Sequence, residues 1–243
     1  MEKQIVTPYN QEDKGKKEQV ASMFDRIAGR YDFMNHFLSM GIDISWRKKA
    51  VKLLKGHPID HLLDIATGTA DLAIAMLDTG ANKITGLDIS QGMLDVGTKK
   101  IKDKGLEDKI TLKLGDSENI PFEDASFEAI TVSFGVRNFE NLEKGLGEIY
   151  RVLKPNGKVV VLEFSQPTSF PFKQIYNFYF KYILPLIGRI ASKDTEAYDY
   201  LQRSVHAFPF GDAFLNKLNE QGFKSTKTKS LTLGIASIYT GVK

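Results

Sequence analysis

The sequence predicts an α/β fold with a mostly parallel sheet, and two observations support this prediction. Short apolar runs typical of buried strands alternate with stretches of helical periodicity. The first run, residues 61–65, ends in a small turn around Gly68, and the second run, residues 84–87, leads to Asp88. Asp88 follows Gly68 by about 20 residues, where nucleotide-binding folds place the acid that holds a ribose. A ribose-bearing cofactor is therefore expected at this turn.

The N-terminal part is predicted to be helical. Residues 1–15 are polar and are expected to form a mobile tail. Within residues 16–58, Val20 and Met23 recur at helical spacing, and Phe33 continues an apolar face. We expect these helices to form a lid over the cofactor edge of the sheet.

Residues 59–165 are predicted to form the cofactor-binding core. Further strands are predicted at residues 110–114, 127–134 and 159–164. In open α/β sheets ligands bind outside the carboxyl ends of the strands, so the polar residues that follow these strands are expected to share one edge. These polar residues are Asp64, Asp88, Asp116 and Ser133.

After the fifth strand, residues 166–210 are predicted to be a helical insertion, and residues 211–243 to hold a helix and a terminal pair of strands. The apolar residues of the insertion are Phe170, Phe172, Ile175, Tyr176, Phe178, Tyr179, Phe180, Tyr182, Ile183, Leu184, Leu186 and Ile187. One interpretation is a helix that packs on the sheet. The other is a pocket for an apolar acceptor, or a face that contacts lipid, because basic residues stand among the apolar ones.

The turn itself indicates which cofactor is bound. Residues 66–71 contain one glycine, whereas the dinucleotide fingerprint requires three around a pyrophosphate. Asp71, just inside the following helix, would repel a pyrophosphate but attract an ammonium group. S-adenosylmethionine has an amino-acid end, a ribose and no phosphate, so it fits better than NAD. A nucleotide-dependent oxidoreductase and a non-catalytic cofactor-binding module remain alternatives.

Composition sets further bounds. A chain of 243 residues is large enough to be a single α/β domain spanning residues 1–243. Its net charge of +3 is too small to predict binding to nucleic acid, and the absence of cysteine excludes disulfides and thiolate metal sites, so no metal is expected. No secretory signal is seen, and no apolar run approaches the ~20 residues of a transmembrane helix. A cytoplasmic protein is expected.

Three segments carry a family resemblance. Residues 31–39, closing at Trp46, look like one signature, residues 151–165 look like a second, and residues 133–138 are similar to the turn after the fourth strand. Together they resemble the menaquinone/ubiquinone biosynthesis C-methyltransferases, which depend on S-adenosylmethionine. The resemblance runs from Phe24 to the C-terminus.

Two positions depart from the family pattern. Asp43 stands where the first signature usually has a histidine, which puts any role for that histidine in doubt here. Asn156 stands where the second signature usually has a glycine, in a turn whose left-handed geometry asparagine tolerates.

The resemblance implies a Rossmann-like methyltransferase fold, with a mostly parallel seven-stranded sheet and an antiparallel last strand. It implies methyl transfer from S-adenosylmethionine to a ring carbon of a prenylated quinol. Demethylmenaquinol is the first choice of acceptor, and a benzoquinol of ubiquinone biosynthesis is the alternative. For the insertion it implies an acceptor pocket, with peripheral contact at the inner face of the cytoplasmic membrane. The oligomeric state stays open, with a homodimer among the alternatives.

By motif match, the resemblance assigns cofactor binding to Thr69, Asp88, Asp116, Ser117 and Ser133, and Asp64, Gly68, Asp71 and Met93 are further candidates for the same site. Asp88 is expected to accept hydrogen bonds from both ribose hydroxyls, and Asp116 from the adenine amino group. Asp64 and Asp71 are expected to face the methionine ammonium. Met93 either covers the adenine or is an ordinary core methionine.

Four residues are candidates for the chemistry on the acceptor. A general base is expected, because removing a proton from the hydroxyl beside the reacting ring carbon makes that carbon a stronger nucleophile. Arg137 is a candidate for stabilising the phenolate, or a surface arginine paired with a carboxylate. Asn138 holds the acceptor or caps the next helix. A histidine is a common general base, so His206 is a candidate for that role, but it is also a candidate structural histidine. Tyr31 is expected to bind the phenol.

Overall fold

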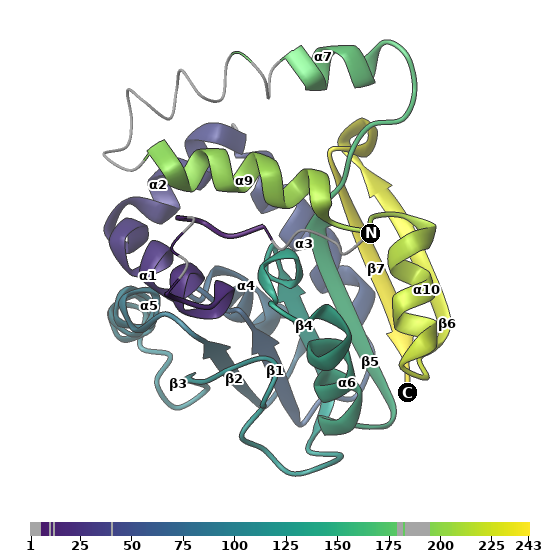
Figure 1. Ribbon diagram of the computed structural model, residues 1–243. Helices are drawn as coiled ribbons and strands as arrows, with labels where there is room; N and C mark the ends of the chain where they lie inside the picture. The colour runs from purple at the N-terminus through teal and green to yellow at the C-terminus, as the bar shows by residue number, and fades with distance from the viewer. Residues whose placement is uncertain (1–5, 10, 12, 40, 179–181, 183–194) are drawn as a thin grey trace.

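A seven-stranded sheet crosses the centre of the computed structural model, which describes residues 6–9, 11, 13–39, 41–178, 182 and 195–243 (Figure 1). The strand order is β3-β2-β1-β4-β5-β7-β6. The strands are β1 (His61–Ile65), β2 (Lys83–Asp88), β3 (Ile110–Leu114), β4 (Phe127–Ser133), β5 (Leu153–Phe164), β6 (Lys224–Leu231) and β7 (Ala236–Val242). The first five are parallel, and β7 lies antiparallel between β5 and β6, which confirms the predicted sheet.

Helices cover both faces of the sheet (Figure 1). They are α1 (Lys16–Ile27), α2 (Tyr31–Ser39), α3 (Ile42–Leu54), α4 (Asp71–Met76), α5 (Gln91–Asp103), α6 (Leu142–Val152), α7 (Phe172–Phe178), α9 (Thr195–Ala207) and α10 (Asp212–Glu220). Helices α3 and α4 pack on one face, and α6 and α10 on the other.

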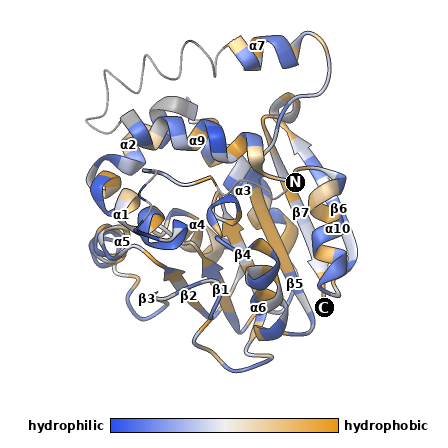
Figure 2. Ribbon diagram, viewed as in Figure 1, coloured by the Kyte–Doolittle hydropathy of each residue, from blue (hydrophilic) through white to orange (hydrophobic). Residues whose placement is uncertain are grey.

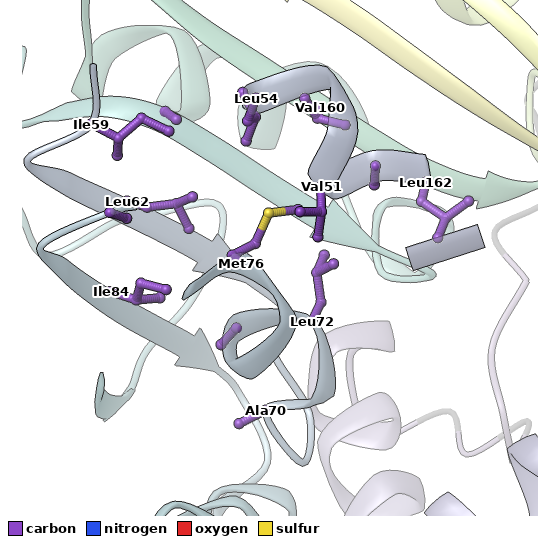
Figure 3. Packing of buried hydrophobic residues seen from close by; sticks show 14 of the residues in the cluster. Val51, Leu54, Ile59, Leu62, Ala70, Leu72, Met76, Ile84, Val160 and Leu162 are labelled. Carbon is purple, nitrogen blue, oxygen red and sulfur yellow. The ribbon is translucent and has the colours of Figure 1, made fainter. Parts of the chain in front are cut away.

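Successive side chains of each strand point to opposite faces of the sheet, so the core is divided into two clusters, one on each face. Leu62 and Val160 point into the cluster under α3 and α4, whereas their neighbours Leu63 and Val161 point into the cluster under α6 and α10. Figure 3 shows the first cluster, in which Leu62 and Val160 lie near Met76 of α4. In Figure 2 the central strands are the most hydrophobic part of the fold. Strands buried on both faces are expected to read as continuous apolar runs.

Thr7 and Tyr9, near the N-terminus, are hydrogen-bonded to α9 and α1. The Tyr9 backbone N–H donates to Gln19 Oε1 at 3.0 Å, and Arg203 Nη2 of α9 donates to the Thr7 carbonyl at 3.0 Å. Thr7 and Tyr9 were expected to belong to a mobile tail. Phe33 of α2, which the sequence placed on a continuing apolar face, has an exposed side chain.

The start of β5 differs from the prediction. β5 begins at Leu153 rather than at residue 159, because the Pro155–Gly157 turn is taken up as an irregularity in the pairing of β5 with β4. Asn156 adopts a left-handed φ of 64°, as expected for that turn. A short 3₁₀ turn, η5 (Thr232–Gly234), separates β6 from β7.

The insertion after β5 contains α7 and α9. Phe170 is 80% exposed, and Ile175, Phe178 and Tyr182 are exposed as well, whereas Tyr176 is buried. Tyr179, Phe180, Ile183, Leu184, Leu186 and Ile187 lie outside the described residues. Within the ranges that the structure describes, the helices are all too short or too polar to cross a membrane.

Candidate functional site

The turn after β1 has a strained backbone built from small residues. Ala66, Gly68 and Ala70 have φ of 51°, 56° and 67°, in the left-handed region that favours glycine. The Gly68 N–H donates to Asp88 Oδ2 at 2.7 Å, which ties the turn to the end of β2. Strain of this kind persists where the surroundings hold it in place, and it is concentrated at binding sites.

A hollow of about 670 Å³, counted with its open mouth, lies at the carboxyl ends of β1, β2 and β4. The polar and charged side chains in its wall are Lys17, Tyr31, Asp88, Asp116, Ser117, Glu118, Ser133, Asn138 and Glu140. Lys17, Val20 and Phe24 share one face of α1, so α1 forms the lid that the sequence predicts over this edge.

Asp88 lies in the wall with acceptor capacity to spare. Its Oδ2 accepts from the Gly68 N–H at 2.7 Å and its Oδ1 from the Ser90 N–H at 2.9 Å. Burial raises the pKa of Asp88, and these backbone hydrogen bonds act in the opposite direction. A carboxylate has about four lone-pair sites, so both oxygens can each accept another hydroxyl. This matches a ribose.

The next strand end supplies Asp116 and Ser117 to the same wall. Asp116 Oδ1 accepts from the Glu118 N–H at 2.8 Å, and its Oδ2 is paired with Lys17 Nζ at 2.6 Å. Met93 is buried and lines the hollow, so it is both a core residue and a wall residue.

The hydrogen bonding of Ser133, at the end of β4, indicates whether the site fits a polar ligand. Ser133 Oγ is buried and has no hydrogen-bond partner among the described residues, and Ser133 is one of the residues that line the hollow. Buried hydroxyls are normally paired. Next to it, Gly135 has no room for a Cβ because Ala66 lies against it, which brings two backbone segments close together. Together with Asp88, this lining fits S-adenosylmethionine.

Asp64 lies beneath the hollow and is not part of its wall. Its Oδ1 accepts from Thr131 Oγ1 at 2.5 Å, and its Oδ2 from Thr67 Oγ1 at 2.7 Å. Burial raises the pKa of Asp64 to about 6, against the effect of these two hydroxyls. Asp64 thereby joins β1, its turn and β4, and both oxygens of its carboxylate accept hydrogen bonds within the protein.

Thr69 and Asp71 also point away from the hollow, into an ion-pair cluster that joins α2, α3, α4 and α5. The cluster consists of Asp32, His36, Asp43, Arg47, Asp71 and Lys100. Lys100 Nζ lies 2.6 Å from Asp71 and 2.7 Å from Asp32, and Thr69 Oγ1 donates to Asp32 at 2.5 Å. The structure thus pairs Asp71 with protein cations rather than leaving it for an ammonium group.

Asp43, the departure from the first signature, has a clear place in this cluster. It is buried, accepts from Ser39 Oγ at 2.6 Å and lies 3.0 Å from His36 Nδ1. It also pairs with Arg47. These hydrogen bonds and charges lower the pKa of Asp43, although its burial acts to raise it. Asp43 therefore fastens α2 to α3.

Arg137 is buried rather than on the surface. Its side chain is 7% exposed, and its Nη1 donates to Glu163 Oε1 at 2.8 Å and to the Phe134 carbonyl oxygen. The guanidinium lies over the Phe164 ring, 5.3 Å from its centroid. Arg137 follows β4 in η3 (Val136–Asn138), and Asn138 from the same turn lines the hollow.

Of the other candidates, Tyr31 and Asn138 lie at the hollow, whereas His206 does not. Tyr31 lines the hollow, and Asn138 Oδ1 accepts from the Tyr200 hydroxyl at 3.1 Å, so Asn138 links the site to α9. Burial raises the pKa of Tyr31 and of Tyr200. His206 is exposed at the end of α9 and does not line the hollow, so the structure does not bring it together with the other candidates.

Four charged residues at the site were missed by the sequence analysis: Lys17, Glu118 and Glu140 in the wall of the hollow, and Glu163 beside Arg137. Lys17 comes from a helix whose place over the hollow is a matter of tertiary packing. Glu163 is a single charged residue in the apolar run of β5, and that signal could have identified it. A charge in a strand buried on both faces requires a partner, and the partner here is Arg137.

The comparisons with known proteins agree with this geometry. The chain is 46% identical to demethylmenaquinone methyltransferase of Bacteroides fragilis over 98% of this chain and 97% of that protein. It is 48% identical to the ubiquinone/menaquinone biosynthesis C-methyltransferase UbiE of Geotalea daltonii over 94% of this chain and 97% of that protein. A crystal structure of a SAM-dependent methyltransferase from Thermotoga maritima, 18% identical, superposes with a TM-score of 0.65 over 91% of this chain and 99% of that chain.

The strand order and this hollow define a Rossmann-like, S-adenosylmethionine-dependent methyltransferase. The hollow is called the donor hollow below, after the methyl donor. More narrowly, the chain belongs to the ubiE/COQ5 methyltransferase family, whose model matches residues 12–243.

Proposed function

We propose that this enzyme methylates a ring carbon of demethylmenaquinol and produces menaquinol. The observation that carries the proposal is the buried Arg137, held beside the donor hollow with its Nε lacking an acceptor among the described residues. A buried guanidinium with an unused N–H can stabilise a methyl acceptor whose oxygen becomes anionic during the reaction. The choice of a naphthoquinol is supported by the Bacteroides fragilis relative, which carries that name.

The donor side of the site is assigned to the wall of the hollow. S-adenosylmethionine supplies an activated methyl group that is displaced in line from its sulfonium. Asp88 accepts from the ribose hydroxyls, Asp116 and Ser117 face the adenine, and Ser133 Oγ gains the partner that it lacks in the protein. The backbone of Gly68 permits close approach. Asp64, Thr69 and Asp71 support the turn and the helices from behind.

On the acceptor side, the residues of the chain orient a phenol and hold charge. The Arg137 guanidinium stabilises negative charge on the ring oxygen as its proton leaves, and such preorganised donors are worth roughly 10²–10³ in rate. Asn138 and Tyr31 lie between the donor side and the acceptor side of the site and position the quinol ring. The lid formed by α1 excludes water from the transfer. The carboxylates in the wall are held by backbone N–H groups and by Lys17, so we expect the hydroxyl proton to leave to a water molecule.

A prenylated benzoquinol is the second candidate acceptor. It is favoured by the Geotalea daltonii relative, whose name includes both ubiquinone and menaquinone biosynthesis. Both acceptors present a phenolic oxygen next to the reacting carbon, so the same Arg137 would serve either. The shape of the acceptor pocket decides between them.

We further propose that the insertion after β5 brings the enzyme to the inner face of the cytoplasmic membrane, where a prenylated acceptor resides. Phe170, Ile175, Phe178 and Tyr182 are exposed, and Lys173 lies among them. Exposed apolar side chains next to basic ones favour an anionic lipid surface. In this scheme residues 1–243 act as one domain, and residues 166–210 form its acceptor part.

The experiment that tests the function supplies purified protein with methyl-labelled S-adenosylmethionine and chemically reduced demethylmenaquinol or demethylated benzoquinol. Mass spectrometry locates the label. We expect it on the ring carbon of demethylmenaquinol, at a rate above that with the benzoquinol, and none on the oxidised quinones. Label on neither quinol, with donor binding intact by calorimetry, would refute the proposed acceptor.

A further inference from the structure

Glu163 is a buried charge for which the proposed chemistry has no direct use. It lies on β5 with 0% of its side chain exposed. Oε1 accepts from Arg137 Nη1 at 2.8 Å and from the Phe164 N–H at 2.8 Å, and Oε2 accepts from the Arg137 backbone N–H at 3.3 Å. One carboxylate thus fixes both the side chain and the backbone of Arg137.

The remaining contacts of Arg137 complete a clamp. Nη1 also donates to the Phe134 carbonyl oxygen, and the Phe164 ring covers one face of the guanidinium. Phe134 is itself held at a left-handed φ of 56°, which is unusual for a large side chain. Strain at a bulky residue persists where the structure needs its position. Here that position places a carbonyl oxygen against the guanidinium.

The clamp does not use the Nε–H donor of Arg137. Arg137 Nε is buried and finds no acceptor within the described part of the chain. The positive charge of Arg137 acts on the phenols of Tyr31, Tyr176 and Tyr200, which come from α2, α7 and α9. Arg137 therefore stands where the lid, the insertion and the end of the sheet meet.

Stability alone is a poor explanation for this arrangement. Replacing a buried ion pair with apolar residues of similar volume is often neutral or stabilising. A buried pair that also leaves an N–H of Arg137 unpaired among the described residues, in the turn from which Asn138 lines the donor hollow, is better explained by a substrate that completes it.

We propose that Glu163 is a positioning residue for methyl transfer: it holds the Arg137 guanidinium so that Nε–H is presented to the acceptor oxygen. This inference rests on the proposed function, since it requires an acceptor with a phenolic oxygen. Glu163 acts through Arg137 and does not touch the substrate.

The test is a double-mutant cycle in the full-length enzyme. The variants are Glu163→Gln, Arg137→Met and the double variant, assayed with saturating methyl-labelled S-adenosylmethionine and dithionite-reduced demethylmenaquinol. We expect Glu163→Gln to lower kcat by about 100-fold, because a misplaced group of this kind costs about that factor. The Kd for S-adenosylmethionine should stay within about 3-fold, and in the Arg137→Met background Glu163→Gln should change kcat by less than about 3-fold.

Glu128→Gln is the matched control, because Glu128 is also a strand glutamate paired with a cation, but that cation is Lys154 of β5 and not Arg137. Its kcat should be unchanged. If Glu163→Gln does not fold, Glu163→Asp keeps the charge but shortens the side chain by one methylene. It should then lower kcat by about 10-fold or more with donor binding intact.

The outcomes separate the two proposals. Full kcat in Glu163→Gln or Glu163→Asp overturns the positioning role and leaves the proposed function standing. A kcat loss of equal size with and without Arg137 also overturns it, since a purely structural role would add independently. A wild-type enzyme that labels neither quinol overturns the proposed function, and the inference with it.

Discussion

The Gly68 N–H donates to the Asp88 carboxylate at 2.7 Å, so the turn after β1 and the end of β2 are held as one unit. The same carboxylate also accepts from the Ser90 N–H at 2.9 Å, at the start of α5. Asp88 therefore both shapes the donor site and lines it. A substitution there should affect donor binding above all.

Replacing Asp88 with asparagine should raise the Kd for S-adenosylmethionine by about 10–100-fold, because hydrogen bonds to a charged group are worth about 1.5–3 kcal/mol. The KM for the acceptor should change much less. Calorimetry with the donor and initial rates with the quinol measure the two effects. Asp95→Asn, an exposed carboxylate on the same α5, is the matched control. Equal changes in both constants would contradict a ribose role.

Ser133 gives a prediction with two parts. Ser133→Ala removes a buried hydroxyl that has no partner among the described residues, so the free energy of unfolding should stay the same or rise slightly. Donor binding should weaken by about 3–10-fold, because one neutral hydrogen bond is worth about 1 kcal/mol. Urea denaturation and calorimetry measure the two quantities. A loss of stability without a loss of donor affinity would show that Ser133 is structural.

The sheet and the line of strand ends could be predicted because they depend on local patterns. Strands buried on both faces read as apolar runs, and the polar residues that follow them share an edge whatever the rest of the chain does. Asp88, Asp116 and Ser133 were found in this way, and all three line the hollow.

The roles of other acids could not be read from their spacing. Asp64 and Asp71 occupy positions at the same edge, but Thr67 and Thr131 pair with the first, and Lys100 with the second. Two of these partners, Thr131 and Lys100, come from distant parts of the chain. Which acid faces a ligand is decided by tertiary packing, and a single sequence does not contain that information in local form.

Asp64 also predicts a pH dependence of stability. Burial raises its folded-state pKa from the ordinary 3.8 to about 6, so the folded protein binds more protons than the unfolded chain between these values. The contribution of Asp64 to the free energy of unfolding is therefore fully present below the pKa that Asp64 has in the unfolded chain. It is lost as pH rises through about 6.

Asp64→Asn should remove that dependence, since an amide can accept from one threonine hydroxyl and donate to the other. Relative to wild type, the variant should gain about 2–3 kcal/mol in unfolding free energy as pH rises from ~4 to ~7. Urea titrations at several pH values measure this difference. If both proteins show the same pH profile, Asp64 does not titrate in this range.

The exposed face of the insertion predicts membrane contact that can be separated from catalysis. Ile175 and Phe178 are three residues apart on α7, and both side chains are exposed. Changing both to glutamine should weaken binding to vesicles of phosphatidylglycerol and phosphatidylethanolamine by about 10-fold or more, since each buried apolar side chain is worth about 1.5–3 kcal/mol. Co-sedimentation measures the binding. Leu114→Gln, at an exposed leucine on the edge strand β3, is the matched control and should bind as wild type does.

Turnover then distinguishes a membrane surface from a core element. With a long-tailed quinol in vesicles, the Ile175→Gln/Phe178→Gln variant should lose activity in proportion to its vesicle binding. With a short-tailed quinol in solution, its kcat and KM should equal those of wild type, because the donor hollow and Arg137 are unaltered. An equal loss with both acceptors would mean that α7 supports the folded core, and the membrane proposal would then be wrong.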